Sequence, residues 1–182
     1  MKDAFIKVVV FDNGKIDYIH ESIYDFEPTN NEIKSNVLPN ITDYWNGAEF
    51  ISIGVKEKPY YVFDYDSKQW IDPRTPYQIK VDKWAEIKAA RDELEFGGFE
   101  FEGNIYDSDQ VSQGRILGAA SAGLSQVWTL ADNTTVNLTA DQLVQLYQAL
   151  QIHIAIAHER GRTAREAIMS ATTKEDVDAV TL

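Results

Sequence analysis

Apolar and polar residues alternate through the first part of the chain. Residues 4–11 are β-branched and aromatic, and residues 15–20 resume the alternation after the pair Asn13-Gly14. An Asn-Gly pair supplies the positive φ angles that a tight turn between antiparallel strands needs. This pattern predicts a β-hairpin at the start of the chain.

Weaker strand signals follow, separated by turn-forming residues. Residues 25–35 are polar and contain a proline, which predicts a surface loop. Residues 36–41 and 49–55 are predicted to be short strands, with Gly47 at positive φ in the turn between them. Residues 59–75 place aromatic side chains on either side of the turn string DSKQ, which predicts a second hairpin.

The spacing of apolar residues changes near Thr75. Thr75 is a suitable helix cap, Pro76 suits the first helical position, and Gln78 completes a capping box. Apolar residues then recur at helical spacing until the pair Gly97-Gly98, which ends the predicted helix. This change of period predicts a domain boundary.

The two predicted domains differ in class. We expect a β-rich attachment domain over residues 1–75 and a helical domain over residues 76–182. Within the second domain, hairpins are predicted near residues 98–106 and 127–138, and the longest helix begins at the capping box of Thr139. The predicted fold class is α+β: an antiparallel β domain, then a helical domain with two hairpins and a long C-terminal helix.

A shorter helix, predicted to run from a cap at residues 107–109 to about residue 122, is rich in small residues. It contains Gly114 and Gly118 together with several alanines. A glycine inside a helix costs about 1 kcal/mol relative to alanine. The close approach of another helix is the explanation that we expect.

The longest predicted helix, over residues 139–171, carries a heptad seam. Its members follow one another at alternating spacings of four and three residues: Leu143, Tyr147, Leu150, Ile154, Ala157, Gly161, Ala164 and Ile168. This spacing is typical of coiled coils. The eight residues are therefore the candidate protein interface.

Two arrangements of this seam remain open. In one, the seam packs inside its own chain against Trp84 and Ile87 of the earlier helix. In the other, it joins several chains. Val144, Ile152 and Ile156 lie off the seam and widen the apolar surface, which favours burial on more than one side. An oligomer on one side and the chain's own hairpins on the other would satisfy both.

Composition excludes some classes of partner. The formal net charge is −12, and nucleic acid and anionic membranes both require a basic surface. The chain has no cysteine, so it contains neither disulfides nor thiolate metal sites. No apolar run reaches the roughly 18 residues of a membrane helix. We expect no nucleic-acid partner and no membrane partner.

The search for catalytic and metal-binding motifs gives no candidate. His153 and His158 are five residues apart, which places them about 140° apart on a helix, so they are not a metal pair. The string that starts at Asp64 resembles a calcium loop, but its sixth position is Gln69 and its twelfth is Thr75. We expect no enzymatic activity, no cofactor and no metal.

The order of several strings from residue 59 onward is distinctive. These strings are PYYVFDYDSKQWIDPRT, KWAEIKAARD, GGFEFEGNIYDSD and WTLADNTTVNLT, followed by the long helix. Over residues 59–182 the chain resembles a C-terminal domain of unknown function that is common in bacteriophage tail proteins. Residues 1–58 carry no such resemblance.

The resemblance implies a structural protein of the virion tail, assembled in the cytoplasm of the bacterial host. The expected function is that of a tail-fibre or baseplate adaptor, acting through contacts with other tail or fibre proteins. Phage fibres are usually trimers, so the resemblance also implies a homo-oligomer, with three chains as the expected number. A tail-fibre assembly chaperone and a receptor-binding tip are the alternatives. No residue of a binding site can be carried over from the family.

Overall fold

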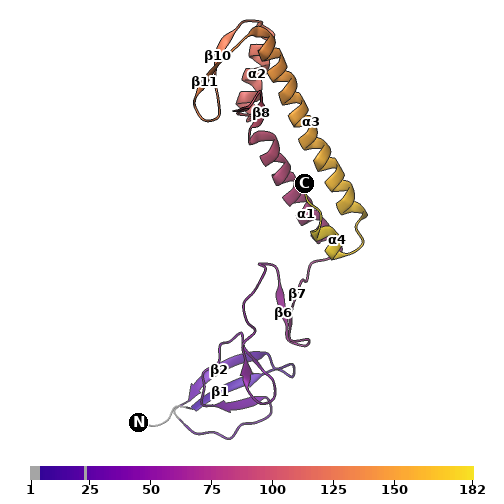
Figure 1. Cartoon of the computed structure of the whole chain (residues 1–182). Helices are drawn as coiled ribbons and strands as arrows, with labels where there is room; N and C mark the ends of the chain where they lie inside the picture. The colour runs from indigo at the N-terminus through magenta and orange to yellow at the C-terminus, as the bar shows by residue number, and fades with distance from the viewer. Residues whose placement is uncertain (1–4, 23) are drawn as a thin grey trace. The chain divides into compact units, whose positions relative to one another are not determined.

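The computed structural model describes residues 5–22 and 24–182 (Figure 1). The chain divides into two compact units, Met1–Arg74 and Thr75–Leu182, which we call unit 1 and unit 2. Unit 1 contains antiparallel strands, whereas unit 2 contains helices, two hairpins and a long C-terminal helix. The predicted α+β fold class is confirmed.

Unit 1 is built on a three-stranded antiparallel sheet. The central strand is β1 (Phe5–Val10), which pairs with β2 (Ile16–Ser22) on one side and β3 (Glu32–Ser35) on the other. Val8 of β1 stands opposite Ile19 in β2 and opposite Ile33 in β3. Aliphatic side chains therefore meet across all three strands, which stabilises this register.

A small core lies against this sheet. Three buried aliphatic side chains form it: Val8, Val10 and Ile16. Trp45 of β4 (Tyr44–Trp45) and Phe50 of β5 (Phe50–Ile51) pack against them. The two aromatic rings also contact each other, with centroids 4.9 Å apart. The short β4–β5 pair thus covers the sheet with aromatic rings.

The predicted first hairpin is present, but its turn differs from the prediction. Gly14 has a positive φ of 78°, whereas Asn13 does not, and the Asn13 side chain instead accepts a hydrogen bond from the Lys15 amide at 3.2 Å. A Cβ atom on Gly14 would lie 2.2 Å from the carbonyl oxygen of Trp45. Glycine is required here by the close approach of a second backbone segment. Ala4, where the predicted strand begins, lies outside the described residues.

The prediction of a loop over residues 25–35 is wrong in its last part. Strand β3 occupies this segment and pairs with the free edge of β1. Ile33 is its one large apolar residue, so the local sequence reads as polar. The edge of β1 supplies the hydrogen-bond partners, and no local pattern shows that such an edge is near.

Of the two strands predicted over residues 36–41 and 49–55, the first is wrong, whereas the second is present as the shorter β5. Residues 36–41 form no strand, and β4 lies inside the segment that was predicted to be the turn. A bridge between Lys15 and Tyr44 connects β4 to the first hairpin. This pairing between distant residues decides where the strand forms. Gly47 does have a positive φ, of 102°, as predicted.

The second predicted hairpin is confirmed as β6 (Val62–Asp64) and β7 (Gln69–Ile71). Phe63 is buried, and its ring contacts Tyr65 and Trp70 at centroid distances of 5.0 and 5.6 Å. The Trp70 indole donates a hydrogen bond to the carbonyl oxygen of Ile53 at 2.8 Å. These aromatic side chains pack within unit 1.

Unit 2 follows the predicted order of helices and hairpins. Its elements are α1 (Pro76–Phe96), β8 (Phe99–Phe101), β9 (Asn104–Tyr106), α2 (Gln110–Ala122), β10 (Gln126–Thr129), β11 (Thr135–Leu138), α3 (Ala140–Ser170) and α4 (Lys174–Asp178). Capping boxes at Thr75 and Thr139 start α1 and α3 as predicted. These two local signals therefore place the starts of both long helices correctly.

Helix α3 is the longest element, and α1 and α2 lie along it (Figure 1). Helix α1 runs antiparallel to the second half of α3: Lys80 donates a hydrogen bond to the carbonyl oxygen of Met169 at 2.8 Å, and Glu95 meets His158 at 3.1 Å. Helix α2 and the two hairpins pack against the first half. Helix α3 therefore contacts α1, α2, α4, β8 and β11.

The small residues of α2 have a different environment from the one predicted. Nothing lies within 4 Å of the point where a Cβ atom would stand on Gly114 or on Gly118. The prediction of a closely packed helix at these glycines is wrong for this chain. The side of α2 that packs on α3 uses Ile116 and Ala119 instead.

Candidate functional site

The heptad seam of α3 is buried inside unit 2. Six of its members are buried: Leu143, Leu150, Ala157, Gly161, Ala164 and Ile168. The other two, Tyr147 and Ile154, are partly buried and pack against the same cluster as Leu143. The structure therefore places all eight predicted interface residues in or against the core of one chain.

The first half of the seam packs through large side chains. Its neighbours come from four other elements, so that β8, β9, α2 and the β10–β11 hairpin all contribute to one cluster: Phe99, Tyr106, Ile116, Leu130, Leu138, Leu143, Leu146 and Leu150. This cluster includes residues from both predicted hairpins. The hairpins are therefore part of the core of unit 2.

The second half of the seam packs through small side chains. A Cβ atom on Gly161 would lie 3.1 Å from the Arg91 side chain of α1, so Gly161 allows α1 to approach closely. Ala164 and Ile168 then join Ile87 in a second apolar cluster, and Trp84 packs against it. The small residues in the second half of the seam therefore accommodate a neighbouring helix of the same chain, α1.

This burial changes which surface can bind a partner. A side chain that is enclosed by its own unit has no surface left for a second chain. Within this fold, the six buried seam residues offer no surface to a second chain. The expectation of a homo-oligomer is unaffected, but the eight seam residues are assigned to the intramolecular core.

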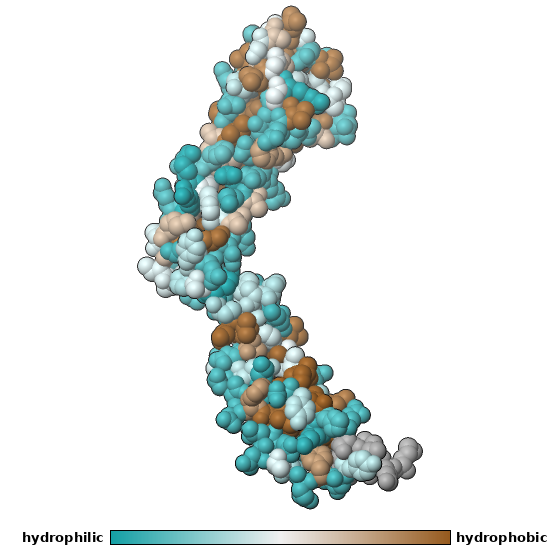
Figure 2. All heavy atoms as spheres, turned by 180° about the vertical axis from the view of Figure 1, so that it is seen from behind, coloured by the Kyte–Doolittle hydropathy of each residue, from teal (hydrophilic) through white to brown (hydrophobic). Residues whose placement is uncertain are grey.

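The face of α3 opposite the seam carries exposed apolar side chains. Val144, Ile152 and Ile156 are 41, 61 and 47% exposed. We call these three residues the outer face of α3. Figure 2 shows exposed apolar residues scattered among polar ones over unit 2. All three residues lie off the heptad seam, as the sequence pattern predicts.

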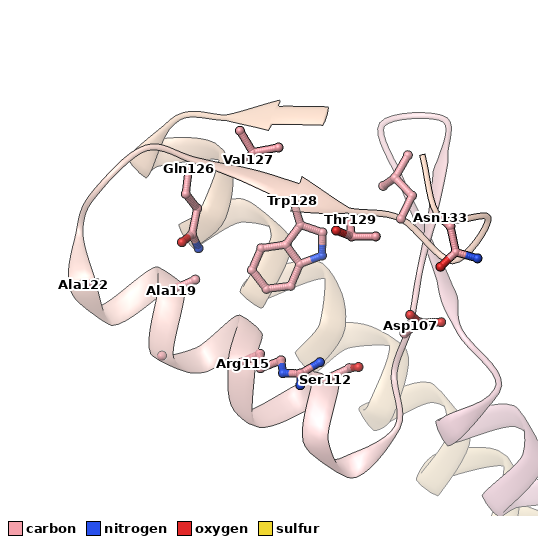
Figure 3. Close-up of a pocket in the computed structure, with 12 residues that line it drawn as sticks. Asp107, Ser112, Arg115, Ala119, Ala122, Gln126, Val127, Trp128, Thr129 and Asn133 are labelled. Atoms are coloured by element: carbon pink, nitrogen blue, oxygen red, sulfur yellow. The ribbon is translucent and has the colours of Figure 1, made fainter. Parts of the chain in front are cut away.

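A groove lies between α2 and the β10–β11 hairpin (Figure 3). Its volume is about 730 Å³. Trp128 extends from β10 toward α2, where Arg115 and Ser112 face it. Gly118 and Ala119 also line the groove, and their small size leaves room beside the Trp128 ring.

Six polar side chains around the groove are uncommitted. Within the described part of the chain, none of them makes a hydrogen bond or an ion pair with another protein group: Asp107, Arg115, Gln126, Trp128, Thr129 and Asn133. Ser112, by contrast, donates its hydroxyl proton to Asp109 at 2.6 Å. This bond and the two amides that Asp109 caps lower the pKa of the Asp109 carboxyl. The groove therefore offers hydrogen-bond donors and acceptors beside the ring of Trp128.

The sequence analysis missed this groove. The lining residues lie in the segment 107–122 and in the hairpin segment 126–133, and only the packing of α2 against the hairpin forms the groove between them. The available signal was the run of small residues in α2, which we had interpreted as a helix contact. A small-residue face is equally compatible with an open groove.

Comparisons with known proteins identify the family of unit 2. The model of a family described as a domain of unknown function, DUF4376, matches residues 78–181. The chain belongs to this family. Searches of curated proteins and of solved structures gave no match. The DUF4376 segment contains the buried seam, the outer face of α3 and the groove, and it does not include unit 1.

The two histidines of the DUF4376 domain both meet the end of α1. The His158 ring lies 3.1 Å from the Glu95 carboxylate, and the His153 ring lies 3.3 Å from the Glu95 carbonyl oxygen. His153 also stacks on Phe99, with ring centroids 5.7 Å apart. Both histidines thus stabilise the junction between α1 and α3.

The described residues contain neither a cluster of metal ligands nor a helix that could span a membrane. No group of three or more His, Cys, Asp or Glu side chains is placed to hold a metal ion there. In the calcium-like string, Asp64 caps its own turn, because it accepts hydrogen bonds from the Asp66 amide at 3.1 Å and the Ser67 hydroxyl at 2.6 Å. In residues 5–22 and 24–182, no helix has the length and hydropathy needed to cross a bilayer.

Proposed function

We propose that this protein is a structural component of a bacteriophage tail, a tail-fibre or baseplate adaptor that acts through protein–protein contacts. The strings that resemble phage tail proteins span residues 59–182, and the DUF4376 match covers residues 78–181 of the same segment. The proposed location is the virion tail, after assembly in the cytoplasm of the host. The proposed partners are other tail or fibre proteins and further copies of this chain.

The observation that carries this proposal is the outer face of α3. Ile152 and Ile156 remain exposed although α3 already fills the core of unit 2 with its opposite side. Complete burial of one isoleucine side chain stabilises an assembly by about 1.5–3 kcal/mol. An apolar strip on a long helix is suited to a helical or fibrous neighbour. The adaptor therefore has a contact surface that its own fold does not use.

The decisive experiment is a test for the protein in mature particles. Virions of the phage that encodes this chain are purified and analysed by quantitative mass spectrometry. A structural adaptor is present at a fixed ratio to the tail proteins. Its absence from virions, combined with binding to immature fibres, would replace the adaptor by the assembly chaperone. Its absence from both would overturn any role in the tail.

A pair of variants tests the proposed contact surface. Ile152→Glu places a charge in the exposed apolar strip, whereas Gln110→Glu places the same charge at an exposed polar position of α2, which packs on the seam side of α3. We expect Ile152→Glu to weaken binding to the tail partner by about tenfold or more. Gln110→Glu should leave that binding within about twofold of the unchanged protein. Equal binding by both variants would exclude the outer face as the contact surface.

A further inference from the structure

We infer that the groove between α2 and the β10–β11 hairpin is a binding site for a saccharide. This inference does not depend on the proposed role in a tail. It rests on the aromatic ring of Trp128, on the uncommitted polar side chains around that ring and on the open space next to α2. Each of these features selects the chemical class of the occupant.

The ring of Trp128 provides the stacking surface. It extends from β10 into the groove and is partly exposed there, while its inner part packs on the core of unit 2. The face of an indole ring carries negative charge density. The C–H groups on one face of a pyranose ring are weakly positive and stack on such a surface. A fixed tryptophan in the wall of a groove therefore suits a sugar ring.

The polar side chains supply the hydrogen bonds that sugar hydroxyls require. Arg115 and the Trp128 indole are donors, Asp107 is an acceptor, and the amides of Gln126 and Asn133 are both. A sugar hydroxyl also donates and accepts, so one saccharide can engage all of these groups. Arg115 has no hydrogen-bond or ion-pair partner among the described residues, and its charge acts on the nearby Asp109 carboxylate.

The same polar groups disfavour an apolar occupant. A polar group that loses its water without gaining a partner costs free energy. An apolar ligand in this groove would leave up to six side chains in that condition. The glycines and alanines of α2 leave open space on the opposite side of the groove, because no atom lies within 4 Å of a Cβ position on Gly118. The space fits a flat, hydroxyl-rich ring.

The test uses the full chain and the indole N–H resonances of its four tryptophans. Trp128→Phe identifies the Trp128 signal and retains an aromatic ring. The chain is titrated at millimolar concentrations with glucose, galactose, N-acetylglucosamine, glucuronate and their disaccharides. We expect at least one of these saccharides to shift the Trp128 signal in a saturable way, while the other three indole signals stay in place.

Two glycine variants provide a matched test and control for saccharide binding in the groove. Gly118→Leu extends a side chain along the wall of the groove, whereas Gly114→Leu adds the same side chain to the same helix outside the groove. Both positions are exposed, and both substitutions raise helix propensity, so both variants are expected to fold. Gly118→Leu should weaken saccharide binding by about tenfold or more. Gly114→Leu should leave it unchanged.

Three outcomes would overturn the inference. The first is that no saccharide of the panel shifts the Trp128 signal. The second is that the shift occurs but persists unchanged in Gly118→Leu. The third is that Gly114→Leu abolishes the shift to the same extent as Gly118→Leu while both variants keep their circular dichroism spectra.

Discussion

Gly14 in unit 1 and the two glycines of α2 in unit 2 have opposite environments. In unit 1, a Cβ atom on Gly14 would lie 2.2 Å from a carbonyl oxygen of the backbone, so the fold requires glycine. In unit 2, Gly114 and Gly118 stand inside a helix with nothing within 4 Å of a Cβ position. Gly14 therefore marks a close contact between backbone segments, whereas Gly114 and Gly118 mark an open side of α2.

The cores of the two units show the same difference. Three buried aliphatic side chains and two covering aromatic rings form the core of the sheet in unit 1. In unit 2, two apolar clusters follow α3 along its length. Stabilisation by burial scales with the apolar area removed from water. We therefore expect unit 2 to keep its fold after a polar substitution better than unit 1 does. The stability of unit 1 should depend more on its turn residues and its ion pairs.

The largest effect is expected from the core of unit 2. Leu150 is fully buried, so Leu150→Ala removes packed atoms and leaves a cavity. The free energy of unfolding should fall by about 2–5 kcal/mol. Gln151→Ala, at the exposed neighbouring position, should change it by less than about 0.5 kcal/mol. Urea denaturation followed by far-UV circular dichroism measures both, and equal effects would contradict the assignment of the seam to the core.

Substitution of Gly14 tests the backbone contact in unit 1. Gly14→Ala combines a strained positive φ with a clash against Trp45, whereas Gly54→Ala has only the strain of its φ of 72°. The strain alone costs about 1 kcal/mol. The free energy of unfolding should fall by clearly more for Gly14→Ala, by about 3 kcal/mol. Near-UV circular dichroism of the unit 1 aromatics follows the transition, and equal losses at both glycines would remove the contrast between the units.

The glycines of α2 are expected to show a stabilising effect. Gly118→Ala should raise the free energy of unfolding by about 1 kcal/mol, because alanine has the higher helix propensity and its Cβ meets no atom. Gly161→Ala is the comparison, since its Cβ would press on the Arg91 side chain at 3.1 Å and offset the gain. Thermal unfolding distinguishes the two. Destabilisation by Gly118→Ala would mean that a further surface packs closely on α2.

The smallest effect concerns the acid response of unit 1. A hydrogen bond from Lys7, helped by donors on Thr29, lowers the pKa of Glu32 from 4.5 to about 2. Because the folded-state pKa is depressed, this interaction contributes stability above pH 4.5, and the contribution is lost as the pH falls through about 2. Lys7→Met should raise the Glu32 pKa, which an NMR titration of its carboxyl group measures. An unchanged pKa would show that Lys7 is not the cause.

Predictions from the sequence succeeded where the signal is local. The capping boxes at Thr75 and Thr139, the pattern of β6 and β7 and the asparagine-glycine hairpin lie within a few residues of the structure that they specify. The predictions from the sequence failed at β3 and β4. Strand β3 forms only by pairing with the edge of β1, and β4 only with its bridge to the first hairpin. Steric and hydrogen-bond preferences of neighbouring residues act without the rest of the fold, but strand pairing does not.

The candidate sites follow the same division. The sequence shows the apolar seam of α3 and the apolar residues off the seam. It does not show whether the seam packs against its own chain or against another one. The groove residues lie on α2 and on the hairpin that follows it, and only the packing of the hairpin against α2 forms the groove between them.

By itself, the sequence determined the α+β class, most helix and hairpin positions and an α3 that is apolar on more than one side. Periodicity and capping are properties of neighbouring residues, which is why these features could be predicted. The tertiary structure decided that α1 and α2 enclose the seam, that Ile152 and Ile156 stay exposed and that Trp128 faces Arg115 across a groove. These features depend on which surfaces bury the most apolar area together, and that is settled by the whole fold.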